Sequence, residues 1–298
     1  MSGIPDILRN MNLSEGYSQT ILPEVRLFKT SAPSGRVPLI YNPSICFILQ
    51  GAKRGYLDGF EFQYDPHTYL VVSVVTPLEM ETVASPEKPL YGLSLALNLV
   101  EINRLVAIIE EAGSDFDLRD EAPQIALGPA RMSFTMAEAL AKLVGTLNSE
   151  ADARVLGPGL IREIYYHALQ EEKGGLLYKL TQYNGHFSQM IKIMSRIHEN
   201  YREKLSVDEL AAQAHMSVSA FHRAFKAIAS ESPIQYQKKI RLHKARDILL
   251  KKSLKSYQVA EEVGYESPSQ FSREFKRFFG YNTAELLKTN NPIRAAAS

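Results

Sequence analysis

Two stretches in the C-terminal third of the chain place arginine, lysine and small polar side chains at matching positions. Residues 210–226 align with residues 259–276 when one extra residue is allowed in the second stretch. Each stretch holds two phenylalanines four residues apart, and these predict a buried helix face that turns the residues between them outward. The outward residues are Ser219, His222, Arg223 and Lys226 in the first stretch, and Ser269, Gln270, Arg273 and Lys276 in the second. Arginine pairs with guanine in the major groove, glutamine with adenine, and lysine with phosphate, so this set predicts recognition of double-stranded DNA.

The elements that must position these side chains are predicted to be helix-turn-helix units. In each unit a small residue stands where two helices cross, and a serine can cap the second helix. These residues are Ala211 and Ser217 in the first unit, and Ala260 and Ser267 in the second. The second unit has Gly264 in its turn, whereas the first has His215 at that place, which predicts a different turn there. A solvated helix face would explain one such stretch, but two in register favour recognition.

A single long helix is predicted between the two units, from Pro233 to Lys252. About 20 residues at about 1.5 Å each span roughly 30 Å, close to the roughly 34 Å between major-groove faces one helical turn apart. Its inward residues are expected to be Ile240, Ala245, Ile248 and Leu249, and its mostly outward residues Lys238, Lys239, Arg241, Lys244 and Arg246. Lys238 and Lys239 are predicted to contact DNA phosphates.

The N-terminal part of the chain is predicted to be rich in strands. Residues 45–49 and 68–75 are apolar runs typical of strands, and Asp58-Gly59 is a favoured hairpin turn. Many short strands imply a barrel or a sandwich. Alternate strand residues point into a barrel, which predicts a ligand pocket lined by Phe47, Leu49, Tyr69, Val71, Met80 and Tyr91. A filled core without a cavity is the alternative.

Helical spacing follows the strands. Residues 100–112, 129–147 and 158–172 are predicted to be helices, with proline in the first turn of the last two. Leu140, Leu143, Val144 and Leu147 would form one apolar stripe, which either packs on its own barrel or forms a dimer seam. Gly174-Gly175 and Asn184-Gly185 bracket the predicted junction between a domain of residues 1–180 and a domain of residues 186–298.

Charge divides the chain in the same way. The net charge is +1, but residues 186–298 hold 19 Lys and Arg against 11 Asp and Glu, while the remainder holds 15 against 22. A basic segment joined to an acidic one is typical of a polyanion-binding domain fused to a domain of another kind. The apolar runs are shorter than the roughly 20 residues of a membrane-spanning helix, and the N-terminus lacks a secretory pattern. We therefore expect a soluble, cytoplasmic protein that has no membrane partner.

Cysteine and histidine offer little further chemistry. Cys46 is the single cysteine, so no internal disulfide can form; it is expected to be a buried structural thiol, with a sensor of electrophiles as the alternative. His67 stands alone among the strands, without the His-x-His pair of a metal cupin, so neither a metal nor a cofactor is expected. Two enzymatic alternatives stay open: a DNA-repair protein with a methyl-accepting cysteine, and a catalytic cupin.

The duplicated motif Ser-x-x-x-Phe-x-Arg-x-Phe-Lys, together with residues 232–236 (Ser-Pro-Ile-Gln-Tyr), resembles the AraC/XylS family of transcription regulators over about residues 188–288. Thr283 departs from the family, which often has proline there. Residues 50–54, 64–73 and 84–89 resemble the cupin-like sensory domain of one branch of that family. The resemblance implies an α+β protein of two domains: an N-terminal cupin-like β-barrel with flanking helices, and a C-terminal all-α domain of two helix-turn-helix units joined by a linker helix. It further implies a small-molecule effector, dimerising helices, a homodimer on promoter DNA and activation through RNA polymerase, without enzymatic activity.

Overall fold

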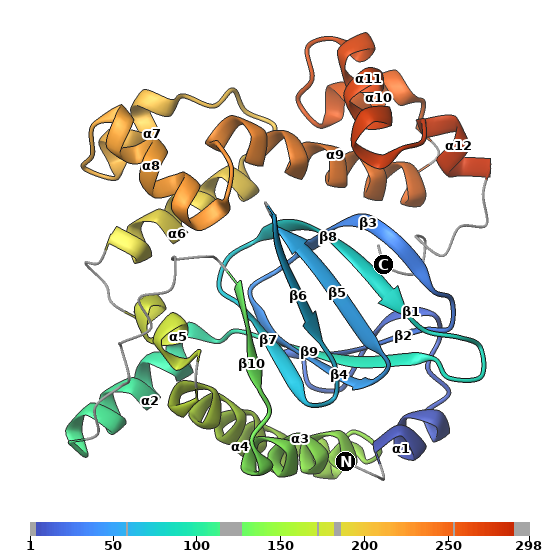
Figure 1. Ribbon diagram of the computed structural model, residues 1–298, viewed down its shortest axis with the longest axis vertical. Coiled ribbons are helices and arrows are strands. Elements are labelled where there is room, and N and C mark those ends of the chain that lie inside the picture. Colours follow the sequence, from blue (N-terminus) through green and yellow to red (C-terminus); the bar gives the residue numbers. More distant parts are fainter. Residues whose placement is uncertain are drawn as a thin grey trace.

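Two antiparallel β-sheets face each other in the computed structural model of the chain, and helices cover the sheets on two sides (Figure 1). The structure describes residues 4–57, 59–113, 127–171, 173–181, 186–252 and 254–288. The predicted two-part organisation is confirmed, because the strands lie within the first half of the chain and helices alone make up the C-terminal part that is described. Of the two pairs expected to bracket the junction, Gly174-Gly175 begins a helix and Asn184-Gly185 lies outside the described residues.

The six-stranded sheet has the strand order β1-β2-β9-β4-β7-β10. Its strands are β1 (Gly16–Gln19), β2 (Val25–Thr30), β9 (Leu90–Ala96), β4 (Ser44–Gln50), β7 (Thr68–Val72) and β10 (Leu127–Arg131). The four-stranded sheet has the order β3-β8-β5-β6, with β3 (Ser34–Tyr41), β8 (Thr76–Val83), β5 (Ala52–Leu57) and β6 (Phe60–Tyr64). The predicted β5-β6 hairpin is present, and Gly59 has a φ of 83° in its turn; Asp58 lies outside the described residues.

The central strands β4, β7 and β9 of the six-stranded sheet are buried on both faces, and this corrects the predicted pocket lining. Met80 lies in the core between the two sheets, together with Cys46 and Leu70. The other five predicted lining residues pack on the opposite face, in the cluster that contains the helices: Phe47, Leu49, Tyr69, Val71 and Tyr91. A strand that is covered on both faces is apolar at every position, so its sequence does not reveal which residues point inward.

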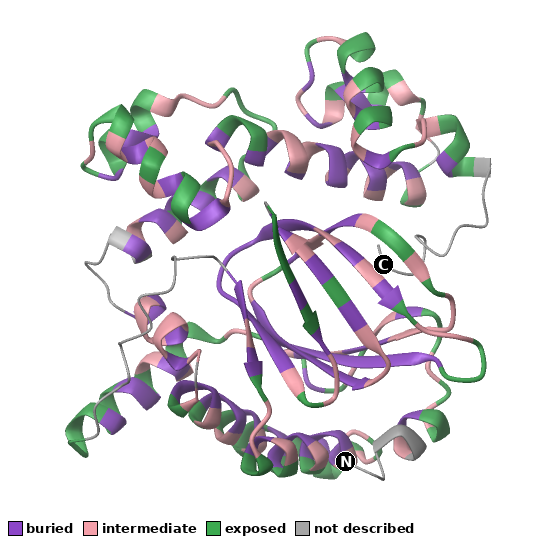
Figure 2. Ribbon diagram, in the orientation of Figure 1, coloured by how far each residue is buried: buried purple, intermediate pink, exposed green. Residues whose placement is uncertain are grey.

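Helices α1 (Ile4–Asn10), α3 (Phe134–Thr146) and α4 (Glu150–Gln170) lie along the outer face of the six-stranded sheet, with α2 (Leu99–Glu111) and α5 (Gly174–Thr181) beside them (Figure 1). Leu140, Leu143 and Val144 are fully buried in the cluster shared with that sheet, and Leu147 packs against it, as the purple stripe of Figure 2 shows for these helices. The apolar stripe therefore packs on its own barrel, and the alternative of a dimer seam along this stripe is wrong.

Two predicted helix starts are also wrong. Pro129 lies in β10 opposite Leu70, and α3 begins after Ser133, whose hydroxyl accepts a hydrogen bond from the Met136 amide. Helix α4 begins after Ser149, so Pro158 lies inside the helix. In both cases a serine cap, which satisfies a free amide of the first turn, determines the start of the helix.

Seven helices form the described C-terminal part: α6 (His186–Glu199), α7 (Val207–Gln213), α8 (Val218–Ala229), α9 (Pro233–Lys251), α10 (Ser256–Glu262), α11 (Pro268–Phe279) and α12 (Thr283–Lys288). Helix α9 runs between the α7/α8 pair and the α10/α11 pair, and it lies across the open side of the two sheets (Figure 1). Within the described ranges, no helix is both long enough and apolar enough to span a membrane.

Candidate nucleic-acid interface and effector cavity

The α7/α8 and α10/α11 pairs have the same turn. His215 has a φ of 54° and Gly264 a φ of 84°, so both occupy the left-handed region. The next amide reaches back to the equivalent alanine in each unit: Met216 N donates to Ala211 O at 3.0 Å, and Tyr265 N donates to Ala260 O at 2.9 Å. The expectation of a different turn in the first unit is therefore wrong; histidine tolerates this conformation better than most side chains do.

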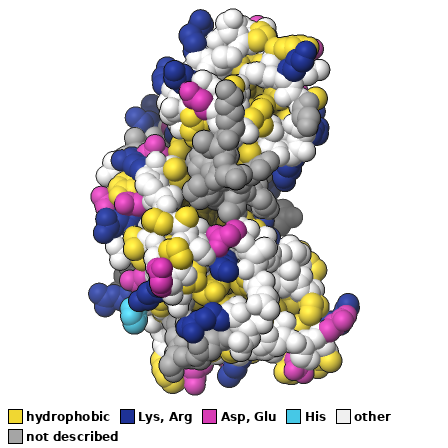
Figure 3. Space-filling view, turned by 90° about the vertical axis from the view of Figure 1, so that its right-hand side faces the viewer, with side chains coloured by type: hydrophobic (Ala, Val, Ile, Leu, Met, Phe, Trp, Pro, Cys, Tyr) yellow, Lys and Arg dark blue, Asp and Glu magenta, His cyan; other side chains and the backbone are white. Residues whose placement is uncertain are grey.

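Each second helix is capped and anchored as the sequence predicts. Ser217 accepts a hydrogen bond from the Ala220 amide, and Ser267 accepts one from the Gln270 amide. Phe221, Phe225, Phe271 and Phe275 are fully buried. The predicted base-reading and phosphate-contacting residues of α8 and α11 are exposed, except for the half-buried His222: Ser219, His222, Arg223, Lys226, Ser269, Gln270, Arg273 and Lys276. Figure 3 shows Lys and Arg side chains along the edges of the upper part of the molecule, where the C-terminal helices lie.

Arg241 of α9 connects the segment before the first unit to the turn of the second unit. Its guanidinium donates to the carbonyl oxygens of Tyr201 at 2.6 Å, Glu203 at 2.8 Å and Gly264 at 2.7 Å. Tyr201 and Glu203 lie just before the first unit, whereas Gly264 lies in the turn of the second. Arg241 was expected to be mostly outward, but its guanidinium is held by backbone carbonyls of the segment before the first unit and of the turn of the second.

The predicted phosphate contacts of Lys238 and Lys239 are not supported by the orientation of these side chains. Lys238 Nζ lies 2.8 Å from Glu274, and Lys239 Nζ lies 2.8 Å from Glu231. Both lysines line a crevice of about 350 Å³ between α9, α11 and the four-stranded sheet, where Arg36 and Glu79 face them. They therefore face the barrel side of α9. Arg246, also expected outward, is 3% exposed and donates to Pro38 O at 3.1 Å.

A second cavity, of about 150 Å³, lies where α6 and α9 close the mouth of the barrel. Barrel residues Tyr17, Arg26, Tyr41, Cys46 and Ser94 line one side, and His198, His243, Lys244, Arg246 and Asp247 line the other. Buried nitrogens of two of these side chains have no hydrogen-bond partner among the described residues: Nδ1 of His198 and both ring nitrogens of His243. The Arg246 guanidinium is held by Pro38 O and by the Tyr281 hydroxyl. Buried polar groups are normally paired, so this set points to a ligand that accepts hydrogen bonds.

The charge states around the cavity follow from burial. Burial and the nearby charges of Arg246 and Lys239 hold the pKa of His243 well below its usual range. Burial and the charge of Lys244 lower the pKa of His198 to about 4. Burial also lowers the pKa of Lys53 to about 8; its ammonium group donates to the hydroxyl of Tyr41, which lines the cavity. An anion placed here would favour the protonated form of each of these bases.

Cys46 is buried, as expected, and its thiol lies 3.3 Å from the Ser44 hydroxyl. Burial raises the pKa of this thiol. A protonated thiol is a poor nucleophile, which favours the structural alternative over an electrophile sensor. His67 is exposed, and no group of three potential metal-ligating side chains occurs among the residues that the structure describes.

Sequence reasoning missed the cavity entirely. Tyr17, Arg26 and Ser94 come from strands with no distinctive motif, and His198 and His243 lie on helices whose buried side is shared with a second domain. No local pattern in the sequence identifies such a site, because its two walls come from segments more than 100 residues apart.

Two linked helix-turn-helix units beside a β-rich domain define a DNA-binding regulator with a separate N-terminal domain. The family described as AraC-type transcriptional regulator N-terminus matches residues 21–176, and a helix-turn-helix domain family matches residues 210–289. The chain belongs to the AraC-type transcriptional regulators, which are not enzymes, so the two enzymatic alternatives are wrong.

Curated relatives support this family assignment. The transcriptional regulator AlkR of Acinetobacter baylyi is 37% identical over 86 residues, which are 29% of this chain and 28% of AlkR. The transcriptional activator RclR of Escherichia coli, described as specific for RCS, is 35% identical over 80 residues, or 27% of this chain and 28% of RclR. The matched part spans less than two fifths of the length of the relatives. ToxT from Vibrio cholerae has a similar fold, with a TM-score of 0.55 and 13% identity over 89% of this chain and 95% of ToxT.

Proposed function

We propose that this regulator is a sequence-specific activator that acts in the cytoplasm on double-stranded promoter DNA and responds to a small organic acid. Its DNA contacts are the exposed side chains of α8 and α11: Ser219, His222, Arg223, Lys226, Ser269, Gln270, Arg273 and Lys276. Lys238 and Lys239 are left out because they face the barrel. Arg223 and Arg273 are the base readers with the strongest chemical preference, since arginine binds guanine through two hydrogen bonds.

The effector site is proposed to be the cavity at the barrel mouth rather than the centre of the barrel. Arg26 and Arg246 line it from opposite walls, and their positive charges together with the unpartnered His243 ring nitrogens suit a carboxylate. Structures of ToxT have been solved with an unsaturated fatty acid and with (E)-4-(8-methylnaphthalen-1-yl)but-3-enoic acid bound, and both ligands are carboxylic acids. A cavity of about 150 Å³ accepts a molecule about the size of benzene without rearrangement, so the effector for this closed form is small.

A ligand in this cavity would contact both parts of the protein and thereby couple effector binding to DNA binding. Helix α9 touches the barrel through Arg246 and through Tyr236, whose hydroxyl donates to Val75 O at 2.6 Å. The Tyr236 ring also contacts Phe225 of α8, with ring centroids 5.5 Å apart. An acid that binds one arrangement of these parts more tightly than another shifts the protein toward that arrangement.

The observation that carries the effector proposal is the pair of buried, unpartnered ring nitrogens of His243 beside the Arg246 guanidinium in the cavity wall. It is tested by measuring the melting temperature with a panel of small carboxylic acids, each paired with the alcohol of the same carbon skeleton. We expect acids, but not their alcohols, to stabilise the protein, and Arg246→Gln to abolish the effect while the exposed Arg104→Gln on α2 leaves it unchanged. Equal shifts with acids and alcohols, or an unchanged response of Arg246→Gln, would contradict the proposal.

The protein is also proposed to work as a homodimer that contacts RNA polymerase. Val100 on α2 and Val155 on α4 are 81% and 76% exposed, and Leu156 is 53% exposed, on the helix side that faces away from the sheet. Val155 and Leu156 are adjacent, and contiguous exposed apolar side chains are typical of association surfaces. Sedimentation of the full chain tests the dimer, which Val155→Glu is expected to weaken; transcription from a promoter with the preferred site, with and without the protein, tests activation.

A further inference from the structure

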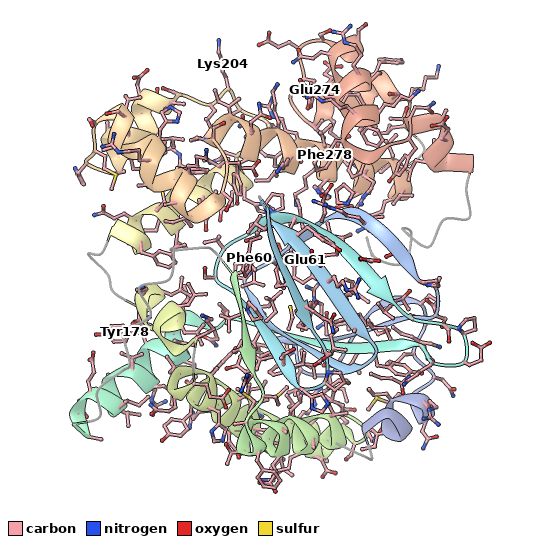
Figure 4. All side chains as sticks on the ribbon, viewed as in Figure 1. Phe60, Glu61, Tyr178, Lys204, Glu274 and Phe278 are labelled. Atoms are coloured by element: carbon pink, nitrogen blue, oxygen red, sulfur yellow. The ribbon has the colours of Figure 1, made fainter. Side chains whose placement is uncertain are left out.

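Glu274 lies on the side of α11 that faces α9, and its carboxylate accepts hydrogen bonds from three side chains. Its Oε1 accepts hydrogen bonds from Lys238 Nζ at 2.8 Å and from Gln270 Nε2 at 3.1 Å, and its Oε2 accepts one from the Tyr265 hydroxyl at 2.8 Å. The Glu274 side chain is only 13% exposed, whereas Gln270 is exposed. Figure 4 shows Glu274 and Phe278 one turn apart on α11, on the side that faces α9 and the sheets. Glu274 therefore lies behind the reading surface and touches it through Gln270.

A carboxylate can accept hydrogen bonds but cannot donate them, and this restricts the Gln270 amide to one orientation. The NH₂ group must turn toward Glu274, because the opposite orientation would place the amide oxygen against a carboxylate oxygen. One N–H is then occupied, while the amide oxygen and the second N–H stay free and face outward. These are the two groups with which glutamine pairs with adenine, accepting from N6 and donating to N7.

We propose that Glu274 is a specificity-determining positioning residue that fixes the amide orientation of Gln270 and thereby makes the second helix-turn-helix unit prefer adenine at one base pair. The inference rests on the proposed DNA-reading role of Gln270. Lys238 and Tyr265 serve this purpose by holding one carboxylate oxygen each, so that the acceptor cannot rotate away from Gln270.

The protonation state of Glu274 agrees with this role. Burial alone would raise the pKa of its carboxyl group, but the hydrogen bonds from Lys238, Gln270 and Tyr265 outweigh burial and lower it. Glu274 therefore stays ionised at neutral pH, and an ionised carboxylate offers only acceptor atoms.

The test begins with selection of the preferred site of the unmodified full-length chain from a random duplex library, followed by affinity measurements with each of the four base pairs at every position. Glu274→Gln keeps the size and shape of the side chain but supplies an NH₂ group, so both orientations of the Gln270 amide become acceptable. Discrimination at one adenine position is expected to fall from about 5- to 150-fold, the usual range for a bidentate pair, to below about 5-fold. Glu261→Gln, an exposed residue on α10 of the same unit, has the same change of charge and should keep the discrimination.

A second variant separates positioning from charge and from folding. Glu274→Asp keeps the negative charge but withdraws the carboxylate from Gln270, so discrimination should fall at the same base pair while affinity for unrelated DNA stays unchanged. Unaltered discrimination in both Glu274 variants, with the melting temperature of each within a few degrees of the unmodified chain, would overturn the proposal.

Gln270→Ala distinguishes failure of this inference from failure of the reading role itself. If Gln270→Ala leaves every base preference intact, Gln270 does not read DNA, and both proposals fall at this position. If Gln270→Ala removes the adenine preference, then adding Glu274→Gln should cause no further change. A further change of preference in the double variant would mean that Glu274 reads a base directly, which contradicts a positioning role.

Discussion

His215 and Gly264 occupy the same left-handed position in the turns of the two helix-turn-helix units, although one carries an imidazole and the other no side chain at all. The His215 side chain is exposed, so its removal costs no packing. A Cβ on Gly264, in contrast, would lie 2.3 Å from the carbonyl oxygen of Arg202. The two units thus reach one backbone geometry under different local constraints.

Replacing His215 with glycine and replacing Gly264 with alanine should therefore have opposite effects on stability. His215→Gly is expected to raise the free energy of unfolding by up to about 1 kcal/mol, because glycine adopts positive φ without strain. Gly264→Ala is expected to lower it by about 2 kcal/mol or more, since strain and a backbone clash add up. Urea unfolding of both variants provides the measurement. A loss of stability in His215→Gly would show that the imidazole contributes contacts that the turn geometry does not reveal.

The two reading arginines should contribute to sequence preference and not merely to affinity. Arg223→Ala or Arg273→Ala is expected to weaken binding to the preferred site by about 1 to 3 kcal/mol and to relax the preference at one base pair. Binding to unrelated DNA should change much less. Titration of preferred and scrambled duplexes at the same salt concentration measures the two affinities. An equal loss of affinity for the two duplexes would identify the arginines as phosphate contacts.

Lysines on the reading helices and lysines on α9 should differ in their effect on salt dependence. Lys226→Ala or Lys276→Ala removes an exposed cation, so the slope of log affinity against log salt should fall by about 1. Lys238→Ala and Lys239→Ala should leave that slope nearly unchanged, because these lysines are paired and face the barrel. A reduced slope for Lys239→Ala would place this lysine on the DNA after all.

Stability should decrease as the pH falls below about 6.5, the ordinary pKa of histidine. His243 has a pKa well below that value in the folded chain, so the unfolded chain takes up the proton first and gains stability relative to the folded form. Melting temperatures measured between pH 7 and pH 5 should fall by several degrees. His243→Phe, which keeps a ring against Phe278 and Phe279, should reduce this dependence. The part that remains should come from His198, whose pKa is also lowered, to about 4. An equally steep profile in His243→Phe would assign the whole dependence to other groups.

The reading helices were predictable because their signals are local. Each cap, Ser217 or Ser267, has its phenylalanine pair and its turn residue within about a dozen residues. The second copy of the pattern strengthens the prediction made from the first. The strands of the six-stranded sheet were also recognisable as apolar runs. The side of the sheet on which each side chain lies could not be predicted, because Phe47 and Cys46 are both apolar but lie on opposite sides.

Helix α9 shows why the orientation of charged side chains was harder to predict. A helix with one buried face places its cations outward, and that assumption failed for Arg241 and Arg246. Here α9 is covered both by its own helical domain and by the barrel, and buried Gln237, His243 and Arg246 lie among its apolar residues. The barrel surface that buries them is distant in sequence. The periodicity of apolar residues along α9 therefore does not predict that these polar side chains are buried.

The contacts of Arg241 affect which DNA sites the protein can bind. Arg241 holds the turn of the second unit to the middle of α9, and the Tyr236 ring of α9 packs against Phe225 of α8, so the protein has little freedom to change the distance or the twist between α8 and α11. A duplex whose two contact regions are one base pair out of phase must therefore be bent or untwisted to engage both helices. The stiffness of the base steps between the contacts, which no side chain touches, then contributes to which sites are occupied.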